Sequence, residues 1–170
     1  MDSNLSLRLG FKGRLKLNAQ AVPLHEGYLK DGGIVDVKNQ SKGLPFGVVC
    51  SAPADDPNAI VAGKGSGNVI RGIVAFSDEI AQTAVAAPGK YLAGMPCAFI
   101  VKGLVQIESW ETGKDPVIGY KVQFKDDDGT IGFVSSSADA SHTLLEGATV
   151  VKVTDRQPSY GSVKEKINET

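Results

Sequence analysis

The apolar stretches of this chain are short, and turn-forming residues separate them. The longest stretch without a charged residue runs over 43–54, whereas a membrane-spanning helix needs about 20 apolar residues. The chain has 20 glycines and 8 prolines among its 170 residues, roughly 16% against a usual total of about 12%. This pattern predicts an all-β fold of short strands and turns, with no membrane-spanning helix.

The overall composition is that of a globular domain with balanced charge. Hydrophobic residues make up 42% of the chain and charged residues 22%, and 18 Lys and Arg stand against 19 Asp and Glu, for a net charge of −1. A general binder of nucleic acid normally carries an excess of basic residues, so we expect no nucleic acid partner. The first residues lack the basic and then apolar regions of a secretory signal, which favours synthesis in the cytoplasm.

The N-terminal segment, 1–26, has the most regular pattern in the chain. Apolar residues fall on odd positions and cations on even positions, and this period of two predicts strand. Within 1–30 there are five cations and two anions. Two interpretations remain open: the solvated face of an edge strand, or a basic arm that docks on an acidic surface of a protein partner, with nucleic acid a weaker third choice. The cations are Arg8, Lys12, Arg14 and Lys16, and the apolar residues are Leu5, Leu7, Leu9, Phe11, Leu15 and Leu17.

The segment 27–154 contains the remaining predicted strands and forms one β domain in our interpretation. Over 98–108, alternation places Phe99, Val101, Val105 and Ile107 on one face of a half-buried strand. Over 77–88, a short helix capped by Ser77 and an ordered loop are both compatible with the sequence. The other strands are predicted at 34–39, 48–50, 60–62, 68–76 and 148–154.

The clearest local prediction is a β-hairpin. The segments 120–125 and 130–134 flank the turn 126–129, in which Asp128 and Gly129 supply the residues that a tight hairpin favours. Beyond Asp155 the periodicity is lost, so 155–170 is a polar tail, either disordered or ordered only against a partner.

Two motifs suggest ligand binding but lack the necessary positions. The run GKGSG at 63–67 lacks the spacing of a phosphate-binding loop and has Asn68 where a dinucleotide motif needs its last glycine. We therefore predict a flexible loop there. The run DDDG at 126–129 resembles part of a calcium loop, but Phe124 and Ser135 occupy the first and twelfth positions, where ligands are required. We predict no metal site and no cofactor.

The sequence contains no convergent set of catalytic residues, and we predict that the protein is not an enzyme. His25 and His142 are the two histidines, and both stand beside turn residues, which is typical of solvated surface histidines. Cys50 and Cys97 are the two cysteines, each flanked by apolar residues, which favours buried free thiols over a disulfide or metal ligands.

Four segments carry a resemblance to a known family. They are GYLKDGGIVDVKNQSKGLPFG (27–47), VIRGIVAFSDEI (69–80), KYLAGMPCAFIVKGLVQIE (90–108), and the hairpin formed by DPVIGYKVQF and DDDGTIGFV. In the order of these four segments, this chain resembles the small head decoration proteins of tailed bacteriophages, which are often called structural cement proteins.

The resemblance implies a compact β-barrel or tulip-like β domain on the outer surface of a mature icosahedral head. It implies that the protein binds the major capsid protein and bridges neighbouring capsid subunits. It also implies that the protein commonly forms a homotrimer. The family has no catalytic residues. On this basis we expect capsid contact through the L-P-F-G turn and the basic arm, that is, through Leu44, Pro45, Phe46 and Gly47 and through Arg8, Lys12, Arg14 and Lys16.

Two other functions remain open from the sequence. A small β module that recognises host-surface carbohydrate would need exposed aromatic residues, for which Trp110 and Tyr160 are the candidates. A minor hydrolase would use Cys50, or a serine together with His142.

Overall fold

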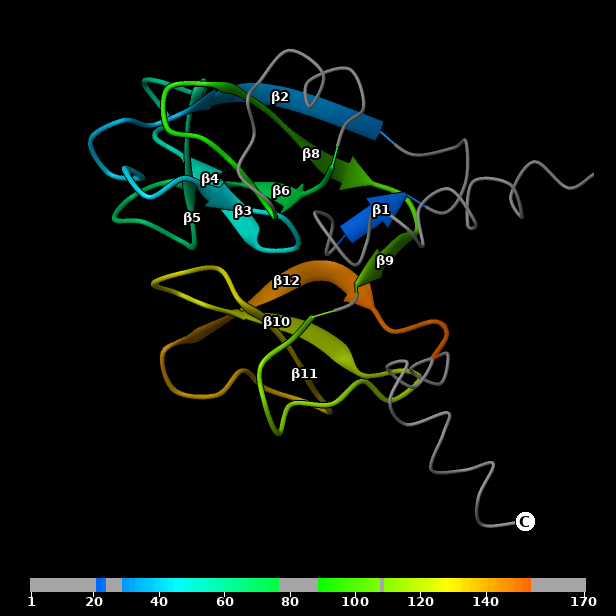
Figure 1. Ribbon diagram of the computed structural model, residues 1–170. Helices are drawn as coiled ribbons and strands as arrows, with labels where there is room; N and C mark the ends of the chain where they lie inside the picture. The colour runs from blue at the N-terminus through cyan, green and yellow to red at the C-terminus, as the bar shows by residue number, and fades with distance from the viewer. Residues whose placement is uncertain (1–20, 24–28, 77–88, 108, 154–170) are drawn as a thin grey trace, which may run out of the picture.

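The computed structural model describes residues 21–23, 29–76, 89–107 and 109–153. All regular structure in these residues is β-strand, as the sequence predicted. Among them there is no helix of the length and hydrophobicity that a membrane crossing needs. Figure 1 shows two stacked parts, a barrel above and a three-stranded sheet below.

The barrel is a closed sheet of five strands in the order β2-β5-β4-β6-β8. β2 and β5 pair in parallel, and the other pairs are antiparallel. Closure leaves no free sheet edge, and a barrel this narrow is filled by its own side chains. The strands are β2 (Leu29–Val35), β4 (Val49–Ala52), β5 (Ala59–Ala62), β6 (Val69–Val74) and β8 (Pro96–Lys102).

Two short pairs flank the barrel. β3 (Leu44–Pro45) pairs with β7 (Lys90–Tyr91), and β1 (Ala21–Pro23) pairs with β9 (Val105–Ile107), both antiparallel. The barrel core is almost entirely apolar, and the Tyr91 hydroxyl donates a hydrogen bond to the Ala75 carbonyl at 2.6 Å. Its buried residues are Val35, Leu44, Phe46, Val48, Cys50, Ala52, Ile60, Val74, Phe76, Tyr91, Cys97 and Phe99.

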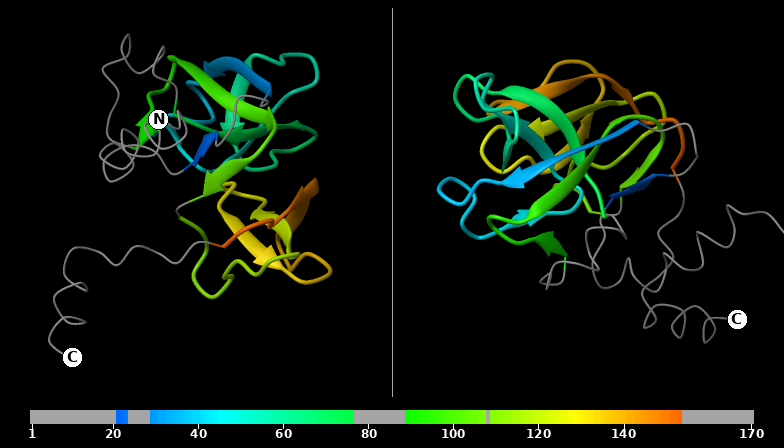
Figure 2. Two further views of the ribbon diagram at one scale, coloured as in Figure 1. Left: turned by 90° about the vertical axis from the view of Figure 1, so that its right-hand side faces the viewer. Right: turned by 90° about the horizontal axis from the view of Figure 1, so that it is seen from above.

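Residues 109–153 form the second part, which we call the sheet unit. It contains β10 (Lys121–Lys125), β11 (Ile131–Val134) and β12 (His142–Thr149), in the order β11-β10-β12. The predicted hairpin is confirmed, because β10 and β11 pair antiparallel across the turn at 126–130. The barrel and the sheet unit also appear as stacked layers when the molecule is turned (Figure 2).

A second core joins the two parts. β4 is buried along its whole length, because Cys50 lies in the barrel core while Val49 lies in the second core. Alternation along a strand places neighbouring side chains on opposite faces, so a strand between two cores is apolar at successive positions. The buried residues of the second core are Val49, Val122, Phe124, Ile131 and Phe133.

Backbone hydrogen bonds reinforce this junction. The Val49 amide donates to the Gly129 carbonyl, and the Lys64 amide donates to the Asp126 carbonyl, both at 2.9 Å. Gly129 has φ of +73°, and a Cβ there would overlap the Val49 carbonyl oxygen. Only glycine meets both requirements, so Gly129 permits the close contact between the hairpin turn and β4.

Several predicted strand boundaries were wrong. The strand predicted at 34–39 is β2, which ends at Val35, because the Asp36 carboxylate accepts hydrogen bonds from the Lys38 and Asn39 amides and forms a turn. β2 also includes Gly33, where a Cβ would come within 2.5 Å of the Ile60 side chain. Strand packing therefore requires a glycine at this position.

The strand predicted at 148–154 lies earlier, because β12 spans His142–Thr149 and pairs with β10. Val151 and Val153 lie outside it and are 61% and 43% exposed. The predicted common face of 98–108 also fails, because Phe99 is buried while Val101 is 47% exposed. The chain forms β8 and β9 there, separated at Gly103 and Leu104.

Candidate functional site

The L-P-F-G turn is held rigidly at the barrel surface. The Phe46 amide donates to the Gly89 carbonyl at 3.0 Å, and the Gly47 amide donates to the Val74 carbonyl at 2.8 Å. Leu44 and Phe46 are 0% and 1% exposed, and the Phe46 ring packs edge-to-face on Tyr91 with centroids 4.9 Å apart. These two side chains therefore anchor the turn from within the core.

The turn also forms one wall of a groove between the barrel and the sheet unit. Half-buried Pro45 lines it together with Gly47 and Val48, and residues from the DDDG turn and β11 form the opposite wall. The groove has a volume of about 270 Å³ and mixes apolar and polar groups; its other lining residues are Ser109, Asp128, Thr130 and Ile131. A groove built on such a fixed turn loses little conformational entropy when it binds a partner.

The outer face of the sheet unit, opposite the barrel, carries a network of charged and polar side chains. The buried Gln123 amide is held by Asp139: its Nε2 donates to Oδ2 at 2.6 Å, and its Oε1 accepts from the Asp139 amide at 3.0 Å. Lys114 Nζ lies 2.7 Å from the same Asp139 oxygen. Its hydrogen bond, followed by that of Gln123, lowers the pKa of Asp139, and the same bond raises the pKa of Lys114.

His142 is the second centre of this network. Its Nε2 lies 2.8 Å from Glu111 Oε2, and its Nδ1 lies 2.7 Å from the Ala140 carbonyl oxygen. A carbonyl and a carboxylate are both acceptors, so the two contacts favour the form of the imidazole in which both ring nitrogens donate. Burial lowers the pKa of His142, but the Ala140 carbonyl and then Glu111 outweigh it, and the pKa lies above its ordinary value. The predicted solvated histidine is therefore wrong, because its side chain is only 9% exposed.

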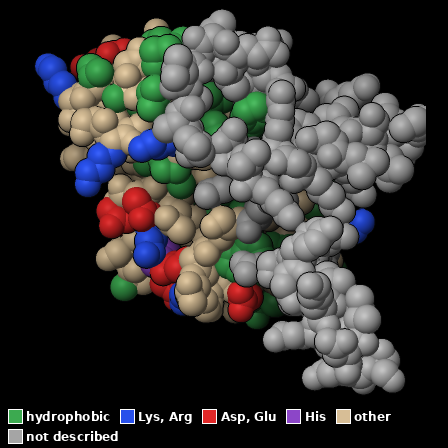
Figure 3. Space-filling view, viewed as in Figure 1, with side chains coloured by type: hydrophobic (Ala, Val, Ile, Leu, Met, Phe, Trp, Pro, Cys, Tyr) green, Lys and Arg blue, Asp and Glu red, His purple; other side chains and the backbone are tan. Residues whose placement is uncertain are grey.

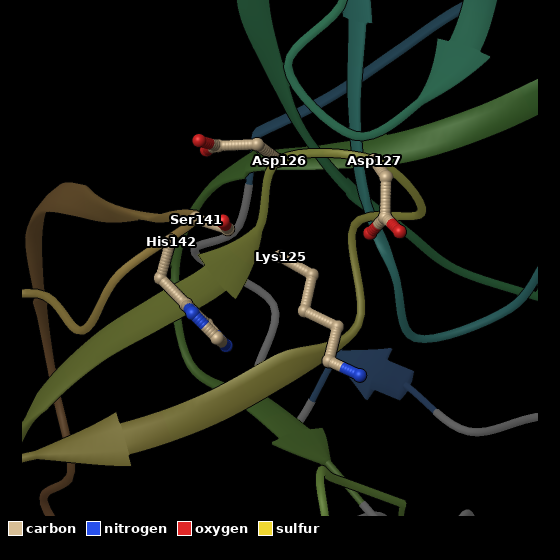
Figure 4. A pocket seen from close by; sticks show the side chains of 5 residues that line it. All are labelled: Lys125, Asp126, Asp127, Ser141 and His142. Carbon is tan, nitrogen blue, oxygen red and sulfur yellow. The ribbon is translucent and has the colours of Figure 1, made fainter.

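A pocket of about 410 Å³ lies beside His142, and Ser141, Lys125, Asp126 and Asp127 complete its lining. Figure 4 shows the Asp126 carboxylate pointing away from the His142 ring; that carboxylate accepts a hydrogen bond from Thr143 Oγ1 at 2.6 Å. Neither His142 nitrogen is available to take a proton from Ser141 while its two bonds hold. The serine and histidine here therefore do not form a nucleophile and base pair.

The cysteine prediction is confirmed, since Cys50 and Cys97 are buried and free. Burial raises the pKa of the Cys50 thiol strongly and that of Cys97 to about 12. A nucleophilic cysteine needs a thiolate, and burial disfavours the thiolate at both positions. Within the described part of the chain, no group of three or more His, Cys, Asp or Glu side chains could hold a metal ion.

The remaining predicted sites divide between the described residues and those outside them. Trp110 is half-buried, packs on Phe133 with centroids 6.1 Å apart and donates from Nε1 to Asp115 at 2.9 Å. It is not the exposed aromatic surface that carbohydrate recognition requires. The other predicted sites lie outside the described residues. They are the basic arm with Arg8, Lys12, Arg14 and Lys16, the segment 77–88, His25, and the tail 155–170 with Tyr160.

Sequence reasoning did not identify the network on the sheet unit. Two of its contacts join residues 16 and 31 positions apart in the chain, namely Gln123 with Asp139 and Glu111 with His142. The available signal was a single polar residue, Gln123, between the apolar residues Val122 and Phe124.

The family comparison gives one match that covers nearly the whole chain. The family model described as "Structural cement protein (E217 gp24/Pam3 gp6)" matches residues 4–164. No curated protein and no solved structure matches the chain.

Proposed function

The chain belongs to the phage structural cement protein family, and on that premise we propose that it binds the outer surface of the mature icosahedral head and bridges neighbouring major capsid protein subunits. The capsid cement role, and with it a place in the virion capsid, follows from the family match over residues 4–164. That match is the observation on which the proposal rests. The family also points to a structural, non-catalytic role.

Cementing is a thermodynamic effect. A protein that binds the assembled shell more tightly than its separate subunits adds free energy to the assembled state. A modest interface suffices when many copies bind to one shell. The closed barrel and the fixed L-P-F-G turn supply a rigid body for such binding, because few groups need ordering on contact.

We propose two contact regions for the shell. The first is the L-P-F-G turn, where Pro45 and the adjoining groove face outward while Leu44 and Phe46 hold the turn from below. The second is the basic arm, with Arg8, Lys12, Arg14 and Lys16, whose cations suit an acidic surface on the shell. Within this proposal, residues 1–26 form the arm, residues 27–154 form the β domain, and residues 155–170 form a tail. The chain is made in the host cytoplasm, and its copies associate as trimers.

Reconstitution on shells stripped of cement tests the proposal. We expect the full chain to bind in hundreds of copies per shell, counted by mass spectrometry against the major capsid protein, and to raise the temperature at which the shell opens. A handful of copies per particle, or an unchanged opening temperature, would refute the proposal.

Charge reversal tests the arm separately. Arg14→Glu with Lys16→Glu reverses two arm cations, and Lys38→Glu with Lys42→Glu reverses two exposed cations of the barrel as the matched control. We expect the arm variant to lose shell occupancy at a given concentration and the control to keep it. Deletion of 1–17 is expected to leave the β domain folded by circular dichroism while weakening shell binding; unchanged occupancy would exclude the arm.

A further inference from the structure

The sheet unit has one strand edge that no other strand covers. Among the described residues, β12 pairs only with β10. The outer edge of β11 is occupied, because the Glu111 amide donates to the Ile131 carbonyl at 2.8 Å and the Phe133 amide donates to the Lys114 carbonyl at 3.2 Å. At eight residues, β12 is the longest strand in the described chain. Such an open edge offers amides and carbonyls for a further strand.

The two faces beside this edge differ in chemistry. Thr143 lies opposite Phe124, and Leu144 lies opposite Gln123. Alternation therefore places Leu145 on the barrel side, where it packs against the second core but stays half-buried. Glu146 follows where the pairing of β12 with β10 becomes irregular; it is exposed and forms no ion pair with any described residue. A strand that completes this edge needs apolar side chains on one face and cations on the other.

The basic arm has this pattern. Its apolar residues occupy odd positions from 5 to 17, and its cations occupy even positions from 8 to 16. The thirteen residues of 5–17 exceed the eight residues of β12. An extended segment that adds to a sheet edge gains main-chain hydrogen bonds, and its alternating side chains give specificity.

The distribution of charge favours a second copy as the source of the added strand. The described barrel region, 29–76 and 89–107, has seven Lys and Arg against four Asp, whereas the sheet unit has four Lys against seven Asp and Glu. Acidic side chains and the histidine gather on the lower, sheet half of the face in Figure 3. Two copies therefore attract when the arm and barrel of one face the sheet unit of the other.

We propose that residues 5–17 of one copy add as a strand to the open edge of β12 in a second copy. The leucine row covers Leu145 and Ala148, and the cationic row lies on the outer face beside Glu146. Such a contact joins two different surfaces, so it closes into a ring or continues from copy to copy. The arm cations that do not contact Glu146 stay exposed on that face and remain available to bind the shell. This inference therefore goes beyond the proposed function and leaves it intact.

Cysteine cross-linking between full-length chains tests the contact directly. Lys12→Cys is made in one chain and Glu146→Cys in an isotopically labelled chain, and the two are mixed under mild oxidation; the native thiols are buried. We expect a disulfide-linked mixed dimer by mass spectrometry. The matched control is Asp55→Cys, an exposed barrel position, mixed with the same Lys12→Cys chain. Equal yields of mixed dimer with the control would overturn the proposal.

Sedimentation of the full chain measures how strongly its copies associate with one another. Glu146→Lys is expected to weaken self-association about fivefold, and Leu7→Ser with Leu9→Ser at least about tenfold, because the leucine row loses its burial. Asp55→Lys, which makes the same change of charge in the barrel, is expected not to weaken self-association. A chain that stays monomeric at all concentrations would overturn the proposal. Shell occupancy is measured in parallel, so loss of self-association with retained shell binding separates this contact from the cement role.

Discussion

The barrel and the sheet unit are stabilised in different ways. The barrel closes on an apolar core of its own, built around Phe46, Tyr91 and Phe99. The sheet unit has one apolar face, which it buries against Val49 and other residues from the barrel, and one polar face held by Asp139 and His142. The barrel therefore has what a self-sufficient fold needs, whereas the sheet unit depends on the junction and on its charge network.

Disruption of the barrel core is expected to have the largest effect. Phe46 is 1% exposed and contacts Phe76 and Tyr91 edge-to-face. Phe46→Ala removes these contacts and leaves a cavity, so the free energy of unfolding should fall by about 3–5 kcal/mol in chemical denaturation. Ile118→Ala, at a side chain that is 67% exposed, is the control and should cost less than about 0.5 kcal/mol. A similar loss in both variants would contradict the closed core.

The junction is the next most sensitive point. Gly129→Ala introduces a Cβ that overlaps the Val49 carbonyl at a position with φ of +73°. We expect a loss of about 2–4 kcal/mol and, by hydrogen exchange, faster opening of the sheet unit than of the barrel.

Gly113→Ala separates the steric effect from the backbone effect at the junction. Gly113 has φ of +79°, but a Cβ there meets open space. This variant should cost only about 1–2 kcal/mol, from the positive φ alone. Equal losses at Gly113 and Gly129 would show that the close contact with Val49 contributes nothing.

Removal of Asp139 should affect the polar face of the sheet unit. Asp139→Ala leaves the buried Gln123 Nε2 without its acceptor, and an unsatisfied buried polar group costs about 1–3 kcal/mol. Asp55→Ala removes an exposed carboxylate from the barrel region and is the matched control. Partial recovery in the double variant Asp139→Ala with Gln123→Leu would identify the unsatisfied amide as the cause.

The smallest expected effect is a pH dependence from His142. Its pKa is raised in the folded chain, so its contribution to stability is complete below the unfolded pKa of about 6.5 and is lost as the pH rises through the folded pKa. We expect less than about 1 kcal/mol.

Glu111→Gln removes the carboxylate, so the pKa of His142, followed by NMR titration, should fall. The free energy of unfolding of this variant should also depend less on pH between 6 and 8 than that of the wild type. An unchanged titration would show that Glu111 does not stabilise the charged imidazole.

Local sequence patterns predicted the elements that depend on local chemistry. Asp128 and Gly129 predicted the correct hairpin, and Gly129 takes the positive φ of its turn. The apolar flanks of Cys50 and Cys97 gave the correct burial. The all-β class followed from short apolar runs between glycines and prolines.

The tertiary structure decided the features that depend on partners distant in the chain. β12 includes adjacent Leu144 and Leu145 and a bulge region at Gly147, so its sequence lacks a period of two; pairing with β10 defines it. Leu44 and Phe46 are buried because the barrel core surrounds them, and no neighbour in the chain indicates this.

By itself, the sequence determined the all-β class, the hairpin, the buried thiols and the resemblance to cement proteins, because each of these rests on residues that are neighbours in the chain. Only the tertiary structure decided barrel closure, the junction at Val49 and the hydrogen-bond partners of His142. These arise from strand register and from pairs such as Glu111 with His142, which folding brings together and no local pattern records.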